Sequence, residues 1–239
     1  MKRLLHFAAT LVLAGTAAMA SAVDTNPPEG AHEVVRQATE AVMSTVDEAQ
    51  AYIDAEPDRF YDQLQDILDP VVDFRGFARG VMGPYASSER YRSLDAEGRE
   101  QLRGQLERFT EVMRVGLVRT YGKGLLAFGG SRIEVPELSE EEAAGSRAAV
   151  RQLIFSDGSE PYVLVYHMGR DKDGAWKLRN MVIENVNLGE IYRSQFESAA
   201  RKHDGDLDRV IAGWTAVEIE TETKTKTKTE TETETETET

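Results

Sequence analysis

The chain has 239 residues, a formal net charge of −14 and no cysteine. Nucleic acid and anionic lipid surfaces would repel such an acidic protein, and it cannot be held together by disulfides. Because 41% of its residues are hydrophobic, it is long and apolar enough to build its own core. We therefore expect a domain that folds around its own core or around a ligand.

Residues 1–22 have the layout of a secretory signal peptide. Lys2 and Arg3 precede an apolar stretch from Leu4 to Leu13, and small residues lead to Ala22. This stretch is too short to span a bilayer as a helix. We expect cleavage after Ala22, a linker over 23–30, and a soluble, exported mature protein.

The first part of the body shows the period of helices. Apolar residues recur at helical spacing over 31–54, and Pro57 opens a second helix that ends or kinks at Pro70. Asp73 can cap a short helix over about 74–82. The pattern therefore predicts three successive helices.

The longest predicted helix extends from about residue 95 to 127, with apolar residues along one side. It contains Gly104, Gly116, Gly122 and Gly124, which lower its intrinsic stability. These glycines indicate either close packing against a neighbour or a bend.

From Ser131 onward the period changes to two, which is typical of strands. The predicted strands are 131–136, 146–156, 160–169 and 174–188, with turns at 156–159 and 171–174. A helix pair over 189–202 and 206–214 closes the body. Helices followed by strands predict an α+β fold, in which a curved antiparallel sheet of about four to five strands packs against a helical layer.

The last predicted strand has an unusual pattern. Trp176 and Leu178 alternate with charged residues, as a half-buried strand requires, but Met181, Val182 and Ile183 then follow one another. With a side-chain period of two, this run makes both faces apolar. Either the chain's own residues cover both faces, or one face meets an apolar ligand.

Residues 218–239 alternate Thr with charged residues. Their eight Glu and three Lys give −5, which leaves −11 on the body between signal peptide and tail. No apolar residue follows Ile219, so the alternation has no face to bury. We expect a disordered tail that adds nothing to the core.

Motifs for catalysis or metal binding are missing from the sequence, which has no HExxH, no GxSxG and no glycine-rich phosphate loop. His167 lies on a predicted strand and would be an acid or base if it faced a pocket beside a carboxylate. A surface or hydrogen-bonded histidine is the other interpretation. We expect no catalytic residue, metal site or cofactor.

Three stretches resemble a known family. They are AEPDRFYDQLQDILDPVVDFRGFARGVMGPY from Ala55, RTYGKGL from Arg119 and KDGAWKLRNMVIENVNLGEIYRSQF from Lys172. They resemble, in order, the signature stretches of the MlaC family of periplasmic phospholipid-binding proteins, also called toluene-tolerance auxiliary proteins. The resemblance covers about residues 31–214, and its most specific part is the strand beginning at Trp176 followed by the helix with Tyr-Arg-Ser-Gln-Phe at 192–196.

The resemblance implies a monomeric periplasmic carrier with a lipid-binding domain over 31–217. Such a carrier moves phospholipid between an outer-membrane lipoprotein complex and an inner-membrane ABC transporter, and helps to maintain the lipid asymmetry of the outer membrane. Acyl chains would lie between the sheet and the helices, with the headgroup outside. The expected lipid contacts are Phe74, Val81, Met82, Tyr85, Met113, Leu117, Tyr121, Val163, Val165, Trp176, Met181, Ile183 and Val186.

Two other functions remain open on the residues alone. The first is a small-molecule enzyme on a cone-shaped α+β fold that uses His167 as its acid or base. The second is a purely structural envelope protein. The direction in which His167 points and the presence of extractable lipid would distinguish the three.

Overall fold

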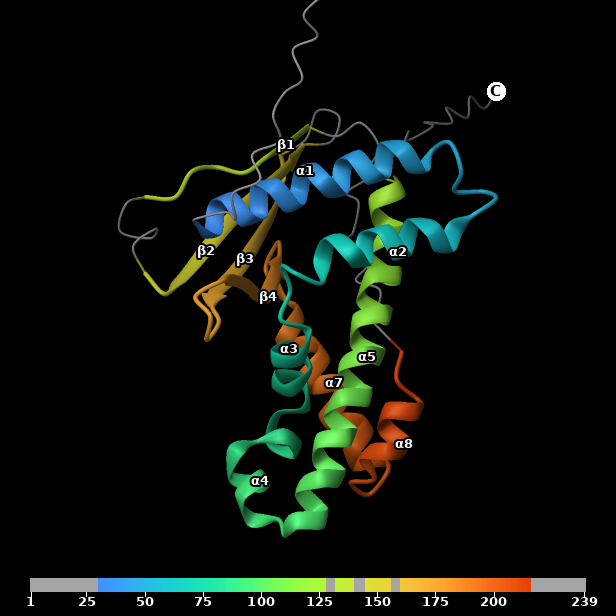
Figure 1. Ribbon diagram of the computed structural model, residues 1–239, viewed down its shortest axis with the longest axis vertical. Helices are drawn as coiled ribbons and strands as arrows, with labels where there is room; N and C mark the ends of the chain where they lie inside the picture. The colour runs from blue at the N-terminus through green and yellow to red at the C-terminus, as the bar shows by residue number, and fades with distance from the viewer. Residues whose placement is uncertain (1–29, 128–131, 140–144, 156–159, 216–239) are drawn as a thin grey trace, which may run out of the picture.

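The structure is a computed structural model that describes residues 30–127, 132–139, 145–155 and 160–215 (Figure 1). The expected signal peptide over 1–22, the linker up to residue 29, the turn over 156–159 and the tail from 218 lie outside the described residues. Within the described ranges, seven α-helices and a five-stranded antiparallel sheet confirm the predicted α+β fold. None of the described helices is long and apolar enough to cross a membrane.

The first two helices pair with each other. Helix α1 (Ala31–Ala49) ends earlier than the predicted residue 54, because residues 50–55 continue as tighter turns; the amide of Tyr52, for example, donates to the carbonyl of Ala49 at 3.0 Å. Helix α2 (Pro57–Leu68) begins at its proline, which needs no hydrogen-bond acceptor there. Figure 1 shows α1 lying across the sheet, with α2 beside it.

Helix α3 (Phe74–Met82) has the predicted cap, since the Asp73 carboxylate accepts a hydrogen bond from the Gly76 amide at 2.9 Å. Gly83 ends α3 with a φ of +53°, and the 3₁₀ helix η1 (Gly83–Ala86) follows. The next helix, α4 (Ser88–Ser93), was not predicted from the sequence, although Ser87 caps it by accepting from the Arg90 amide. A helix of six residues is too short to show a period.

Helix α5 (Ala96–Ala127) is the long predicted helix. It extends from the end of the molecule near α4 to the region of α1 and α2 (Figure 1). Its Gly122 sits where α2 approaches closely, because a Cβ at this position would lie 2.8 Å from Leu64 Cδ1. A Cβ at Gly124 would meet nothing within 4 Å. Close packing against α2 therefore explains the glycine at position 122 but not the one at position 124.

The strands follow one another in chain order across the sheet, as β1 (Arg132–Glu134), β2 (Arg147–Phe155), β3 (Tyr162–Arg170), β4 (Trp176–Ile183) and β5 (Val186–Asn187). The predicted turn over 171–174 joins β3 and β4, where the Asp171 carboxylate accepts from the amides of Asp173 and Ala175 at 2.9 Å. Gly174 has the positive φ of +83° that this turn needs.

Two details of the last strand differ from the prediction. The single strand predicted over 174–188 is divided into β4 and β5 by a reversal at Glu184, whose φ is +56°. In addition, β4 contains a bulge: Leu178 pairs with Met168 and Asn180 with His167, which leaves Arg179 as an extra residue. The Arg179 guanidinium forms an ion pair with Asp73, so the bulge ties the sheet to the start of α3.

Helices α7 (Leu188–Lys202) and α8 (Leu207–Ala212) complete the fold, separated at the predicted breaker by the positive φ values of Asp204 and Gly205. The side chain of Asn187 caps α7 by accepting from the Glu190 amide at 3.3 Å. Together with α3 and α5, these helices form a tightly packed core whose largest members, Phe109, Tyr192 and Phe196, are fully buried. This helical half lies at the end of the molecule away from the sheet (Figure 1).

Candidate functional site

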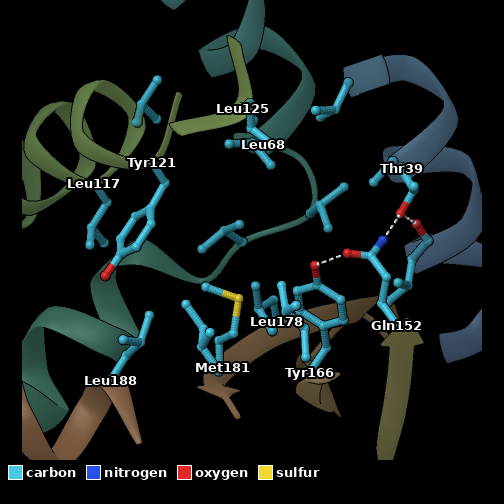
Figure 2. Close-up of a pocket in the computed structure, with 18 of the residues that line it drawn as sticks. Thr39, Leu68, Leu117, Tyr121, Leu125, Gln152, Tyr166, Leu178, Met181 and Leu188 are labelled. Carbon is cyan, nitrogen blue, oxygen red and sulfur yellow. Dashed lines mark hydrogen bonds between the residues drawn. The ribbon is translucent and has the colours of Figure 1, made fainter. Parts of the chain in front are cut away.

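A cavity of about 600 Å³ lies between the concave face of the sheet and the helices (Figure 2). Helix α1 covers it on one side, α2 and α5 on another, and α3 with the start of α7 closes it toward the helical half. Side chains from five helices and four strands thus meet around one space. Its volume falls in the range of about 300–1,000 Å³ that is usual for small-molecule sites.

The wall of the cavity is almost entirely apolar. The helices and the loop after α2 contribute aliphatic and aromatic side chains: Val35, Val42, Met43, Leu64, Leu68, Val71, Phe74, Phe77, Leu117 and Leu125. The sheet and the start of α7 contribute Ile133, Ile154, Leu164, Met168, Leu178, Met181, Ile183 and Leu188. Such a wall suits hydrocarbon, for which burial stabilises by about 0.8 kcal/mol per CH₂ group.

One chain of hydrogen bonds crosses this apolar wall. The Tyr166 hydroxyl donates to Gln152 Oε1 at 2.8 Å, Gln152 Nε2 donates to Thr39 Oγ1 at 2.7 Å, and Thr39 donates to the carbonyl of Val35 at 2.8 Å (Figure 2). Gln152 is only 4% exposed. Because each member has a partner within the chain, the network fixes the sheet to α1 without leaving an unpaired polar group toward the cavity.

Two tyrosines of the wall, Tyr121 and Tyr166, remain neutral. Burial raises the pKa of Tyr166 well above its usual value. Burial also raises the pKa of Tyr121, and its hydroxyl lies 3.3 Å from that of Tyr192. Neither phenol therefore offers an ionised base near neutral pH.

The described lining residues include no His, Cys, Ser, Asp or Glu. The two cationic side chains among them are Lys123 and Arg179, and Arg179 is paired with Asp73. His167 is exposed on the opposite face of the sheet, opposite Ala149 and Asn180. The acid–base site that required His167 to face a pocket beside a carboxylate is therefore not formed at this cavity.

Five of the thirteen expected lipid contacts line the cavity: Phe74, Leu117, Tyr121, Met181 and Ile183. Met181 and Ile183 are the two residues of the apolar run in β4 that share a face, and Val182 points to the other face of the sheet. Of the two apolar faces of this run, the one formed by Met181 and Ile183 therefore faces the cavity.

The other eight expected contacts lie elsewhere. Val81, Met82 and Met113 are fully buried in the helical core, and Tyr85 packs against it. Val81, Met82 and Met113 share helices with cavity residues, but their side chains lie on the helix faces that pack against α7 and α8.

On the sheet, Val163 and Val165 alternate with the cavity residues Leu164 and Tyr166, so they point to the opposite face. Trp176 packs beneath α1 in a separate cluster with Val34 and Val150. Val186 lies on the edge strand opposite Ile183 and does not reach the cavity wall.

Sequence reasoning also missed residues that do line the cavity, above all those of α1 and the alternate positions of β3. The pairing register of β3 and β4 would have identified the β3 residues, because Leu164 pairs with Ile183 and Tyr166 with Met181. Directly paired residues share a face, so placing Met181 and Ile183 in the cavity places Leu164 and Tyr166 there too. This inference needs the bulge at Arg179, which the sequence did not indicate.

The chain matches the family described as MlaC protein over residues 36–216. It is also 29% identical over 183 residues to the toluene tolerance protein ttg2D of Pseudomonas putida, covering 77% of this chain and 79% of that protein. A phospholipid-binding protein from Ralstonia solanacearum, solved in complex with a phospholipid, has a similar fold. Its TM-score is 0.57 at 21% identity, and the match covers 76% of this chain and 97% of that one.

These matches place the fold in a known class. The family match spans most of the described body, including every strand and, apart from the first five residues of α1, all helices that form the cavity. The chain therefore belongs to the MlaC family.

Proposed function

We propose that this protein is a periplasmic phospholipid carrier that holds acyl chains in the cavity between the sheet and the helices. The carrier would exchange lipid with an outer-membrane lipoprotein complex and an inner-membrane ABC transporter, and so help to keep the outer membrane asymmetric. The observation that carries the proposal is the apolar cavity, whose described wall has no acid–base or nucleophilic set.

Three further observations support it. The similar protein from Ralstonia solanacearum was solved with a phospholipid bound. The curated relative is a toluene tolerance protein, a property that fits a role in the cell envelope. The first 22 residues have the pattern of a signal peptide, which fits export.

The proposal assigns lipid contact to the cavity residues rather than to all of the positions expected from the sequence. Met181, Leu117 and Leu125 lie on different sides of the cavity and would surround an acyl chain (Figure 2). The neutral Tyr121 and Tyr166 would add aromatic surface without placing a charge beside hydrocarbon.

Neighbouring residues of β4 provide a matched test. Met181 faces the cavity, whereas Val182 faces the other side of the sheet, and both are half-buried. A carboxylate at position 181 would have to be desolvated beside hydrocarbon, which costs several kcal/mol unless it is protonated or reaches water. A carboxylate at position 182 would not meet the ligand.

The experiment is mass spectrometry of organic extracts from protein purified without detergent. We expect phospholipid in the natural protein and in Val182→Glu, and markedly less in folded Met181→Glu. Folding is checked by circular dichroism. Absence of phospholipid from the natural protein would overturn the carrier function, and equal lipid in the two folded variants would overturn the assignment of the cavity.

A further inference from the structure

A second depression, of about 470 Å³, lies between α3, α4 and the first turns of α5. Four arginines line it: Arg75, Arg79, Arg92 and Arg103. Among the described residues that line it there is no Asp or Glu. Figure 1 shows α4 at the end of the molecule remote from the sheet, whereas α3 carries residues of both the arginine groove and the apolar cavity.

The positive charge of the groove is only partly compensated. Arg75 lies 3.7 Å from Glu107, and Arg103 pairs with Glu100. Arg79 and Arg92 form no ion pair with any described carboxylate. A local excess of positive charge attracts anionic groups to this groove, although the chain as a whole has a formal net charge of −14.

Neutral groups hold two of the arginines in place. Arg79 donates from Nε to the carbonyl of Ala86 at 3.3 Å and from Nη2 to Ser88 Oγ at 2.7 Å. Arg103 donates to the Tyr91 hydroxyl at 2.5 Å. These bonds orient both guanidinium groups, which lowers the ordering cost of binding an anion, and Arg79 keeps its charge free of any ion pair with a described carboxylate.

The floor of the groove is apolar, formed by Ala86, Leu102 and Leu106. An apolar floor ringed by arginines and a tyrosine has the composition of a protein–protein hot spot. A flat membrane surface would reach the rim but not the floor, whereas a side chain from a folded or extended partner segment can reach both.

We propose that the arginine groove is the docking site for an acidic segment of a partner protein, with carboxylates on the arginines and an apolar side chain on the floor. The proposal rests on the proposed carrier function, because a carrier must meet other proteins to load and unload. On α5, Leu117 in the cavity lies eleven positions after Leu106 in the groove, which is about 16 Å along the helix axis. On α3 the two sites are closer, since the groove residue Arg75 follows the cavity residue Phe74, so a partner bound in the groove would lie beside a helix that also forms the cavity wall.

The test compares two double variants of the full chain that change the charge equally. Arg75→Glu with Arg92→Glu alters the groove, and neither side chain makes a hydrogen bond that holds the fold together. Arg147→Glu with Arg151→Glu alters two exposed arginines on the outer face of the sheet. Binding of a fluorescein-labelled peptide of alternating glutamate and leucine is followed by fluorescence anisotropy at low salt.

We expect the groove variant to weaken peptide binding about tenfold or more and the sheet variant to change it by less than about twofold. Replacing glutamate by glutamine in the peptide should abolish the difference. Equal weakening by both variants would overturn the proposal, since it would indicate only a general effect of net charge.

Two further measurements separate other occupants. If the groove variant abolishes binding to phosphatidylglycerol vesicles, or to inorganic phosphate, but leaves peptide binding unchanged, the groove binds those anions and the proposal is wrong. Lipid content by mass spectrometry should be the same in both variants. A natural protein without lipid would overturn the carrier function, while the peptide titration would still decide the groove.

Discussion

The helical half and the sheet half of this protein use similar apolar side chains in different ways. In the helical half, Phe109 and Phe196 are fully buried and their ring centroids are 4.9 Å apart. In the sheet half, Met181 and Ile183 are only half-buried and face a cavity of about 600 Å³. Apolar side chains therefore pack against one another throughout the helical half, whereas in the sheet half part of the apolar surface faces open space.

The division also explains the position of the long helix. The first turns of α5 border the arginine groove, its middle carries Phe109 and Met113 into the core, and its last turns form a wall of the cavity. One helix thus fixes the distance between all three regions, because its backbone hydrogen bonds make it a stiff element.

The largest expected effect comes from truncating the same residue type in each half. Met113 is 0% exposed in the helical core, so Met113→Ala should lower the free energy of unfolding by about 2–5 kcal/mol. Met181→Ala enlarges a cavity that already exists and should cost about 1 kcal/mol in lipid-free protein. Urea unfolding of delipidated protein measures both, and equal losses would remove the distinction between the two halves.

A smaller effect is expected where α5 passes α2 on the cavity wall. A Cβ at Gly122 would lie 2.8 Å from Leu64 Cδ1, so Gly122→Ala should destabilise the protein by about 1–2 kcal/mol. Gly124→Ala is the control, because its Cβ would meet nothing within 4 Å. Because alanine has a higher helix propensity than glycine, Gly124→Ala should raise the free energy of unfolding by up to about 1 kcal/mol. The midpoint temperature of thermal unfolding should fall in Gly122→Ala and rise in Gly124→Ala. A rise in Gly122→Ala would show that α2 can move away from α5 at little cost.

The smallest effect, seen only in alkaline solution, tests whether the cavity wall is dry. Burial raises the pKa of Tyr121 and Tyr166 above their ordinary value of 10.0. Because the folded-state pKa is the higher one, the resulting stability is fully present below pH 10 and is lost as the pH rises further.

The absorbance of tyrosinate should therefore rise in two phases in the folded protein and in one phase in urea. Tyr121→Phe with Tyr166→Phe should remove most of the late phase that accompanies unfolding. If the folded natural protein ionised all of its tyrosines in a single phase near pH 10, water would have free access to the wall.

The sequence predicted most of the local structure, because helix caps and periods depend on neighbouring residues. The Asp73 cap, the turn over 171–174 and the breaker before α8 all lie where they were predicted. Helix α4 was not predicted, because it is too short to show a period. Strands β4 and β5 were predicted as one strand, because the reversal at Glu184 contains no glycine or proline.

The candidate site was predicted less well than the fold. Composition shows that Val163, Val165 and Val182 are apolar but not which way they point. If side chains alternated without interruption along β4, Val182 and not Met181 would share a face with Trp176 and Leu178. The extra residue at Arg179 reverses this phase, so a bulge held by an ion pair with Asp73 decides which side chains meet the cavity.

By itself, the sequence determined the α+β order of elements, the acidic character of the chain and its resemblance to the MlaC family, since these follow from local patterns and from residue identity. Only the tertiary structure decided which apolar side chains pack together and which surround open space. It also decided that arginines from α3, α4 and α5 converge on one groove. Such choices depend on register, helix rotation and the approach of distant segments, and no local period encodes them.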